Sequence, residues 1–210
     1  MPDENATGPA VPGPQSSRVN KQLDFPRQDQ QQTFWCWAAV TAAVDDFMNP
    51  GPSLKQCEIA NFAVNTARKA GGLPPLPGDA CQMIPSYNTS LSLHPPLVSI
   101  GRAGNAGGVI LTFEQIQHEI DQGLPIGVRI EWEDGTGHFV TISGYSMGPD
   151  NTPMLMIQDP DPKSKTHEVP YNVFLKKYRL KGKWTETHLV ERGPVASDKL
   201  HVRTLIRASR

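Results

Sequence analysis

The sequence predicts an α+β fold in which helices come first and an antiparallel sheet follows. Between residues 35 and 70, apolar residues recur at helical spacing. From residue 125 onward, short runs of β-branched and apolar residues alternate with turn sequences such as "EDGTG" and "SMGPDN". Helices followed by strands joined through short turns favour an α+β architecture. The 210 residues suffice for one domain with a real core and additional tails.

The N-terminal segment differs from the rest in composition. Residues 1–25 are rich in Pro, Gly, Ser and Asn, which predicts a disordered tail, followed by one domain over residues 26–210. This segment lacks the apolar core of a signal peptide, and no apolar run approaches the roughly 20 residues that span a bilayer. The sequence leaves two alternatives open: that this chain is a mature form, and that the protein is secreted by a signal-less bacterial route.

Two helices are expected directly after the tail. The first begins near Trp35 and stops at Asn49-Pro50-Gly51-Pro52. The second is predicted to begin at Ser53, which forms a capping-box signature with Gln56, and to end at Gly71.

The remainder of the chain alternates between loop, helix and strand signals. Residues 71–109 contain prolines and glycines throughout, which predicts a long irregular connection. A capping box at Thr112 and Gln115 begins a short helix that Gly123 closes. The later expectations are strands over 125–132, 138–145 and 153–160, a short helix over 171–177, and two further strands, "KWTETHLV" and "HVRTLIR".

A possible reactive centre begins with Cys36 in "QQQTFWCWAAV". A thiol attacks as its thiolate, which positive charge stabilises, and Cys36 stands where a helix begins. His138 starts one expected strand and Asp159 ends the next, so a hairpin would bring both to one edge of the sheet. A carboxylate beside an imidazole fixes its tautomer and stabilises its charged form.

The segments "QQQTFWCWAAV", "GHFVTISGY" and "IQDP", in this order, resemble the papain-like cysteine peptidases. They look closest to the bacterial branch that includes plant-pathogen avirulence effectors and is distantly similar to bacteriocin-leader peptidases. The resemblance covers about residues 28–190. It implies a papain-like fold with Cys36 as nucleophile, His138 as general base and acid, and Asp159 as the residue that orients the imidazole. Gln30, six residues before the cysteine, would donate to the oxyanion hole.

The same resemblance implies a hydrolase that cleaves a protein or peptide substrate through a thioester acyl-enzyme, without a cofactor, as a monomer. Papain itself has "CGSCW" and an asparagine third member, whereas Trp35 precedes the cysteine here and the third member is an aspartate. Asp161 is a possible substitute for Asp159, and the neighbouring glutamines could replace Gln30, namely Gln28, Gln31 and Gln32. Deamidation or transamidation by the same triad, and an inert papain-like binding module, are the rival interpretations.

Charge and cysteine usage exclude several other classes. The net charge is −1, with 20 basic and 21 acidic residues spread along the chain, so no footprint for nucleic acid or an anionic membrane is evident. The cysteines and the remaining histidines lack the ligand spacing of a zinc site, so we expect no metal. Cys57 and Cys81 either form a bridge, which would favour an extracytoplasmic setting, or remain free with Cys57 in the core.

Overall fold

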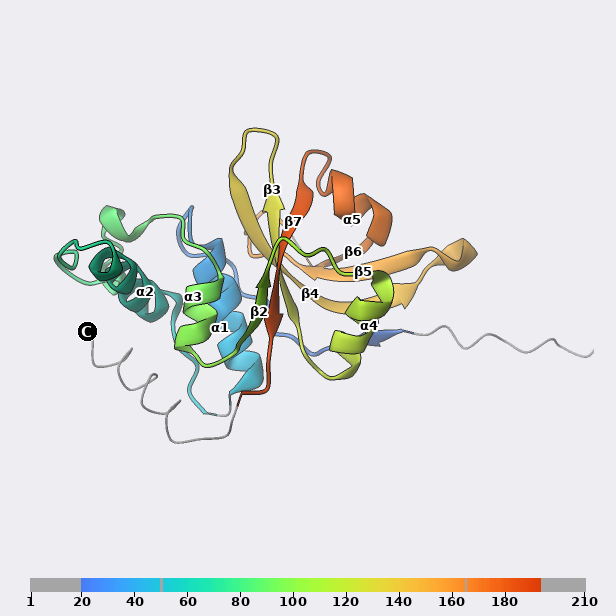
Figure 1. Cartoon of the computed structure of the whole chain (residues 1–210), viewed down its shortest axis with the longest axis horizontal. Coiled ribbons are helices and arrows are strands. Elements are labelled where there is room, and N and C mark those ends of the chain that lie inside the picture. The colour runs from blue at the N-terminus through green and yellow to red at the C-terminus, as the bar shows by residue number, and fades with distance from the viewer. Residues whose placement is uncertain (1–19, 50, 165, 194–210) are drawn as a thin grey trace, which may run out of the picture.

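The computed structural model describes residues 20–49, 51–164 and 166–193. It is an α+β structure in which the main helices precede an antiparallel sheet, as predicted (Figure 1). Its helices and strands, in chain order, are β1 (Lys21–Gln22), α1 (Cys36–Met48), α2 (Gln56–Ala70), α3 (His94–Ser99), β2 (Ala103–Gly107), α4 (Phe113–Asp121), β3 (Ile126–Glu131), β4 (Gly137–Met147), β5 (Pro153–Gln158), β6 (His167–Pro170), α5 (Tyr171–Lys177) and β7 (Lys183–Val190).

The sheet has seven strands in the order β2-β7-β3-β4-β5-β6, with β1 pairing on β4. Ile130 of β3 lies opposite His138 of β4, and Thr141 of β4 lies opposite Gln158 of β5. This register brings the start of β4 and the end of β5 to the same end of the sheet. The two segments that the sequence singled out on the sheet therefore meet there.

Helix α1 occupies the centre of the molecule. Ten consecutive residues, from Cys36 to Asp45, are buried. The sheet packs on one side through β4, and α2 and α3 pack on the other (Figure 1). The alanines in "CWAAVTAAV" allow this close approach from several directions, because a small side chain leaves room for its neighbours.

Two tryptophans fix the start of α1 within this core. Trp35 and Trp37 have no exposed surface, and burying such side chains stabilises the fold by roughly 3 kcal/mol each. The indole N–H of Trp35 donates to the carbonyl of Tyr87 at 2.8 Å, and that of Trp37 donates to the carbonyl of Thr89 at 3.0 Å. Both indoles therefore tie the start of α1 to the loop that follows α2.

The start of α2 differs from the prediction. The helix begins at Gln56, not at Ser53, and Lys55 is its N-cap residue. The hydroxyl of Ser53 donates instead to the carboxylate of Asp46 in α1. The backbone N–H of Lys55 donates to the side chain of Glu58 at 2.9 Å, as in a capping box, and the N–H of Glu58 donates to the carbonyl of Lys55 at 3.0 Å. The side chain of Gln56 takes no part in this cap.

The connection over residues 71–109 is less irregular than expected. It contains two 3₁₀ turns, Ala80–Gln82 and Pro85–Tyr87, then α3 and β2. Strand β2 reads "AGNAG", which lacks β-branched residues and gave no strand signal. It forms through pairing with β7 at one edge of the sheet. Strand β6 was also missed, whereas α4 keeps the predicted capping box at Thr112 and α5 has the predicted bounds.

The last part of the predicted N-terminal tail belongs to the fold. Strand β1 pairs with β4 at Tyr145 and Gly144, and Leu23 and Phe25 are buried. A Cβ atom on Gly144 would lie 2.7 Å from the carbonyl oxygen of Lys21, so only glycine permits this approach. The predicted tail boundary at residue 25 is therefore wrong. Residues 1–19 and the expected strand "HVRTLIR" lie outside the described residues.

Cys57 of α2 and Cys81 form a disulfide, which leaves Cys36 as the free cysteine. Of the two alternatives that the sequence left open, the bridge is the one that forms. It attaches the 3₁₀ turn at Ala80–Gln82 to α2 across 24 positions of sequence. None of the helices in the described ranges is both long and apolar enough to cross a bilayer.

Removing the disulfide should destabilise the fold without touching the free thiol. The bridge closes a loop of 24 positions, for which the chain-entropy model gives roughly 3 kcal/mol. We expect Cys57→Ala/Cys81→Ala to lower the free energy of urea unfolding by about that amount. Cys36→Ala is the matched control, and equal stability of the double variant and the wild type would contradict the expectation.

Candidate active site

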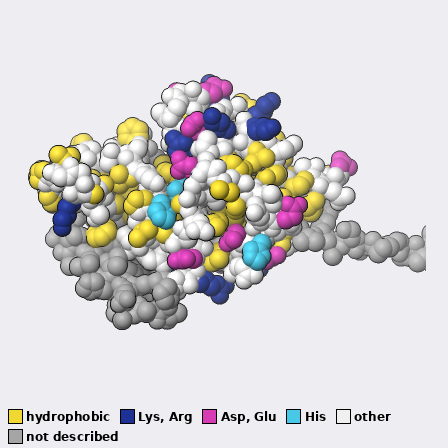
Figure 2. Space-filling view, in the orientation of Figure 1, with side chains coloured by type: hydrophobic (Ala, Val, Ile, Leu, Met, Phe, Trp, Pro, Cys, Tyr) yellow, Lys and Arg dark blue, Asp and Glu magenta, His cyan; other side chains and the backbone are white. Residues whose placement is uncertain are grey.

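A cleft of about 740 Å³ lies between the start of α1 and the end of the sheet that carries the β3–β4 turn. Its walls include Cys36 and Phe34 on the helical side and Trp132 and His138 on the sheet side. Of the four glutamines between residues 28 and 32, Gln30 lines this cleft. On the face that Figure 2 displays, acidic and basic side chains are interspersed, so no single sign of charge dominates it.

Cys36 is the first residue of α1 and is 8% exposed. The first backbone N–H groups of a helix have no acceptor within the helix, and they carry partial positive charge. No side chain of the N-cap residue, Trp35, occupies these groups. The thiol therefore lies beside hydrogen-bond donors that could stabilise negative charge.

His138 connects the thiol to a carboxylate. Its Nε2 lies 2.7 Å from Oδ1 of Asp159, and Cys36 is close enough to the ring to raise the pKa of the imidazole. Since Nε2 is engaged with the carboxylate, Nδ1 is the nitrogen available to the thiol. The structure thus brings Cys36, His138 and Asp159 together, although they are far apart in sequence.

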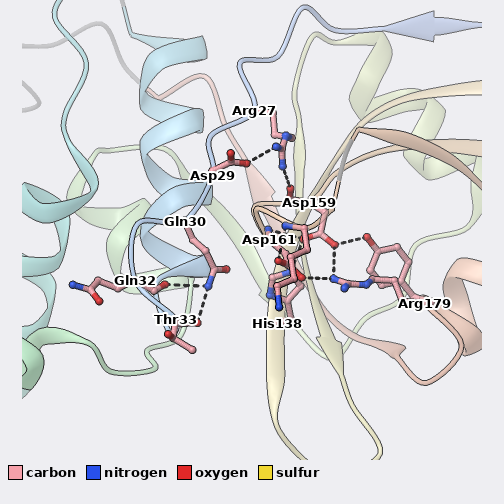
Figure 3. Close-up of polar contacts among 11 residues, drawn as sticks. Arg27, Asp29, Gln30, Gln32, Thr33, His138, Asp159, Asp161 and Arg179 are labelled. Atoms are coloured by element: carbon pink, nitrogen blue, oxygen red, sulfur yellow. Dashed lines mark hydrogen bonds and ion pairs between the residues drawn. The ribbon is translucent and has the colours of Figure 1, made fainter.

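The carboxylate of Asp159 has no exposed surface and is surrounded by donors (Figure 3). Oδ1 accepts from His138 and from the backbone N–H of Asp161 at 2.9 Å. Oδ2 accepts from the hydroxyl of Tyr178 at 2.8 Å and from the guanidinium of Arg179 at 3.3 Å. A buried carboxylate with both oxygens satisfied in this way can remain ionised.

These contacts shift the pKa values of His138 and Asp159 in opposite directions, and both shifts favour the charged form. Burial alone would lower the pKa of His138, but its hydrogen bonds to Asp159 and Cys36 outweigh burial and raise this pKa to about 9. Burial likewise opposes ionisation of Asp159, yet His138, the Asp161 N–H and Tyr178 hold the pKa of this carboxyl well below its usual value. Imidazolium and carboxylate are therefore the favoured states near neutral pH.

The alternative third residue, Asp161, lies in the same loop but does not contact His138 in this way. Its carboxylate accepts from Arg179 at 2.8 Å and from the backbone N–H of Lys163 at 3.0 Å. Only its backbone N–H reaches Asp159. Asp159 is thus the carboxylate within hydrogen-bonding distance of the imidazole.

Three residues around this pair were missed from the sequence, namely Trp132, Tyr178 and Arg179. The Trp132 ring stacks on His138 with centroids 6.0 Å apart and planes 25° apart, and the Arg179 guanidinium lies 5.9 Å from the centre of the Trp132 ring. The Trp132 ring therefore packs on the imidazole, and the guanidinium of Arg179 packs on the Trp132 ring. Strand alternation could have identified Trp132, because in a β3–β4 hairpin it shares a face with His138. Tyr178 and Arg179 reach Asp159 from the α5–β7 turn, and no sequence pattern at these positions indicates that contact.

The side chain of Gln30 is turned toward its own loop in this structure (Figure 3). Its amide nitrogen donates to the carbonyls of Gln32 at 3.0 Å and Thr33 at 2.6 Å. Its Oε1 is buried without a hydrogen-bond partner among the described residues. Both amide hydrogens are therefore engaged, and donation to an oxyanion requires the amide to release one of these carbonyls.

The raised pKa of His138 predicts a loss of stability in alkaline solution. Protonation of His138 stabilises the fold fully below its ordinary pKa of 6.5, and this contribution disappears as the pH rises through about 9. We expect the difference in free energy of unfolding between wild type and His138→Gln to shrink by about 3 kcal/mol over that range. Urea unfolding of both proteins at several pH values measures this difference. A difference that is constant, or that grows with pH, would contradict the assignment.

Comparison with known proteins identifies the family of the chain. The model of the Peptidase_C39 like family matches residues 22–188, which run from the last residue of β1 to most of β7. A solved structure from Bacillus anthracis, described as a candidate C39-like peptidase, is 15% identical, with a TM-score of 0.48, and covers 83% of this chain and 100% of its own. No curated protein matches significantly. The family match spans far more than half of the sequence, and the chain belongs to the Peptidase_C39 like family, a family of the cysteine-peptidase type.

Proposed function

We propose that the protein is a cysteine peptidase that hydrolyses peptide bonds, with Cys36 as nucleophile, His138 as general acid and base, and Asp159 as the residue that orients the imidazole. The observation that carries this proposal is that Cys36 and His138 line one cleft, with the imidazole of His138 hydrogen bonded to the buried carboxylate of Asp159. A cleft large enough for a peptide segment and a free thiol at a helix start are further support.

Acylation begins when the sulfur of Cys36, having given its proton to His138, attacks the carbonyl carbon of the scissile peptide bond. The carbonyl oxygen becomes an oxyanion as the S–C bond forms. When the C–N bond breaks, His138 transfers a proton to the departing amine, and a thioester remains on Cys36. Asp159 keeps the imidazole oriented and stabilises its charged form throughout.

Hydrolysis of the thioester reverses the proton movements. A water molecule attacks the acyl carbon while His138 accepts one of its protons. The C–S bond then breaks, the acid product leaves, and the sulfur of Cys36 returns to its starting state. No group besides the side chains and water is consumed in this cycle.

Two donors are proposed for the oxyanion: the backbone N–H of Cys36 and the side-chain amide of Gln30. The hydrogen that Gln30 directs at the carbonyl of Gln32 can be released at small cost, because this carbonyl also accepts from the backbone N–H of Trp35 at 3.1 Å. No acceptor would be left orphaned by that movement. Catalytic hydrogen bonds commonly form only when the substrate is bound.

The proposed biological setting is a secreted bacterial peptidase of the effector-like branch, acting as a monomer on protein or peptide. The Cys57–Cys81 bridge supports this setting, because such bridges persist in oxidising compartments. The resemblance of "QQQTFWCWAAV" to the effector-like enzymes is the other support. Fractionation of the native bacterial culture would test it, and retention of all the protein in the cytoplasm would contradict it.

Digestion of a peptide library by the purified protein tests the reaction itself. We expect cleaved peptides and no ammonia release, and no cleavage by Cys36→Ala. Ammonia without cleavage would favour deamidation, and a wild-type thiol that does not react with iodoacetamide would favour a binding module.

In the same cleavage assay, His138→Ala should lower the rate roughly 10⁴-fold or more. Asp159→Ala should retain more activity than His138→Ala, Asp159→Asn should retain more than Asp159→Ala, and Asp161→Ala should stay near wild type.

Replacement of each glutamine in turn tests the oxyanion donor. Because such a donor acts only as charge develops, Gln30→Ala should lower the turnover number by roughly 10²–10³-fold while iodoacetamide still labels Cys36 at the wild-type rate. Gln28→Ala, Gln31→Ala and Gln32→Ala should remain near wild type. Small, equal effects at all four positions would mean that backbone groups alone stabilise the oxyanion.

A further inference from the structure

Gln56, the first residue of α2, is 2% exposed, and its side chain ends at the loop that carries Gln30. Its Oε1 accepts from the backbone N–H of Gln31 at 3.0 Å. Its amide nitrogen donates to the carbonyl of Asp29 at 2.8 Å and lies 3.3 Å from the side-chain oxygen of Gln28. All these partners lie outside α2, in the segment before the free cysteine.

The two backbone groups that Gln56 holds flank Gln30: the carbonyl of the residue before it and the N–H of the residue after it. The backbone N–H of Gln30 itself donates to the carbonyl of Pro160 at 2.8 Å, next to Asp159. Gln30 is therefore held from the helical layer by Gln56 and from the loop after β5 by Pro160. Its backbone is fixed where the two walls of the cleft meet.

The burial of Gln56 has no local explanation within its own helix. The capping bond at the start of α2 joins the Lys55 N–H to Glu58 and does not involve the Gln56 side chain. A buried amide must find partners for its donors and acceptor, and Gln56 finds them around Gln30. An apolar side chain would fill the same space without setting the orientation of these backbone groups.

We propose that Gln56 is a positioning residue for acyl transfer: it holds the backbone on both sides of Gln30 so that the Gln30 amide can reach the oxyanion. This inference rests on the proposed function, and specifically on the oxyanion role of Gln30. Gln56 touches neither the substrate nor the reacting atoms. Its effect on the rate should pass entirely through Gln30.

The test uses p-nitrophenyl acetate, an activated ester. Attack by Cys36 forms a thioester and releases p-nitrophenolate, so the initial burst reports acylation whichever acceptor the natural reaction uses. We expect Gln56→Ala to lower the burst rate at saturation roughly tenfold or more, with the half-saturating ester concentration unchanged. Iodoacetamide labelling of Cys36 should stay at the wild-type rate.

Asn65→Ala is the matched control for lost stability. Asn65 lies on the same helix, and its side chain holds another loop through the backbone N–H of Leu76 at 2.8 Å and the hydroxyl of Tyr87 at 3.1 Å. We expect both Asn65→Ala and Gln56→Ala to lower the melting temperature. Asn65→Ala should leave the burst rate unchanged. Should Gln56→Ala fail to fold, Gln56→Met keeps the side-chain volume without the hydrogen bonds. We expect the same loss of burst rate in Gln56→Met.

The double variant Gln30→Ala/Gln56→Ala decides whether Gln56 acts through Gln30. We expect it to be no slower than Gln30→Ala alone, because a positioning effect vanishes with the group positioned. A wild-type burst rate in Gln56→Ala or Gln56→Met, or fully additive losses in the double variant, would overturn the inference. A burst that persists in Cys36→Ala would instead overturn the proposed function, and the inference with it.

Discussion

The site depends on one constraint: the carboxylate of Asp159 has no exposed surface and must nevertheless stay ionised. Removing a charge from water is costly unless donors replace the lost hydration. Here the donors come from the start of β4, from the loop after β5 and from the α5–β7 turn. The order of the sheet, with β4 beside β5, brings the first two of these together.

The α5–β7 turn adopts an unfavourable backbone conformation to contribute its donors. Arg179 and Leu180 have φ values of 48° and 73°, in the left-handed region. For non-glycine residues this costs about 1–2 kcal/mol each. Charge-assisted bonds from Arg179 to Asp159 and Asp161 offset the cost. Burial and the charge of Asp159 raise the pKa of Tyr178, so its hydroxyl stays protonated and continues to donate.

The sequence predicts the parts of the site that lie at the ends of regular elements. Cys36 precedes an apolar helical pattern, and His138 and Asp159 border β-branched runs, so local periodicity locates all three. The α+β class and the bounds of α5 follow from the same signals. Periodicity carries no information on contacts such as that of Tyr178 with Asp159, which arise only when turns fold back. For the same reason, Gln56 resembled a helix cap until its buried partners on another segment were known.

The segment from Arg27 to Gln31 physically couples the two halves of the site. Arg27 donates to the backbone carbonyl of Asp159 at 2.5 Å (Figure 3), and the N–H of Gln30 donates to the carbonyl of Pro160. On its other side the segment is held by Gln56, the neighbour of the disulfide-bonded Cys57. The thiol belongs to the helical layer and the imidazole to the sheet, so any sliding between the layers would separate them. A segment bonded to both layers opposes such sliding, and the hydrogen bonds that stabilise it therefore also maintain the approach of sulfur and imidazole.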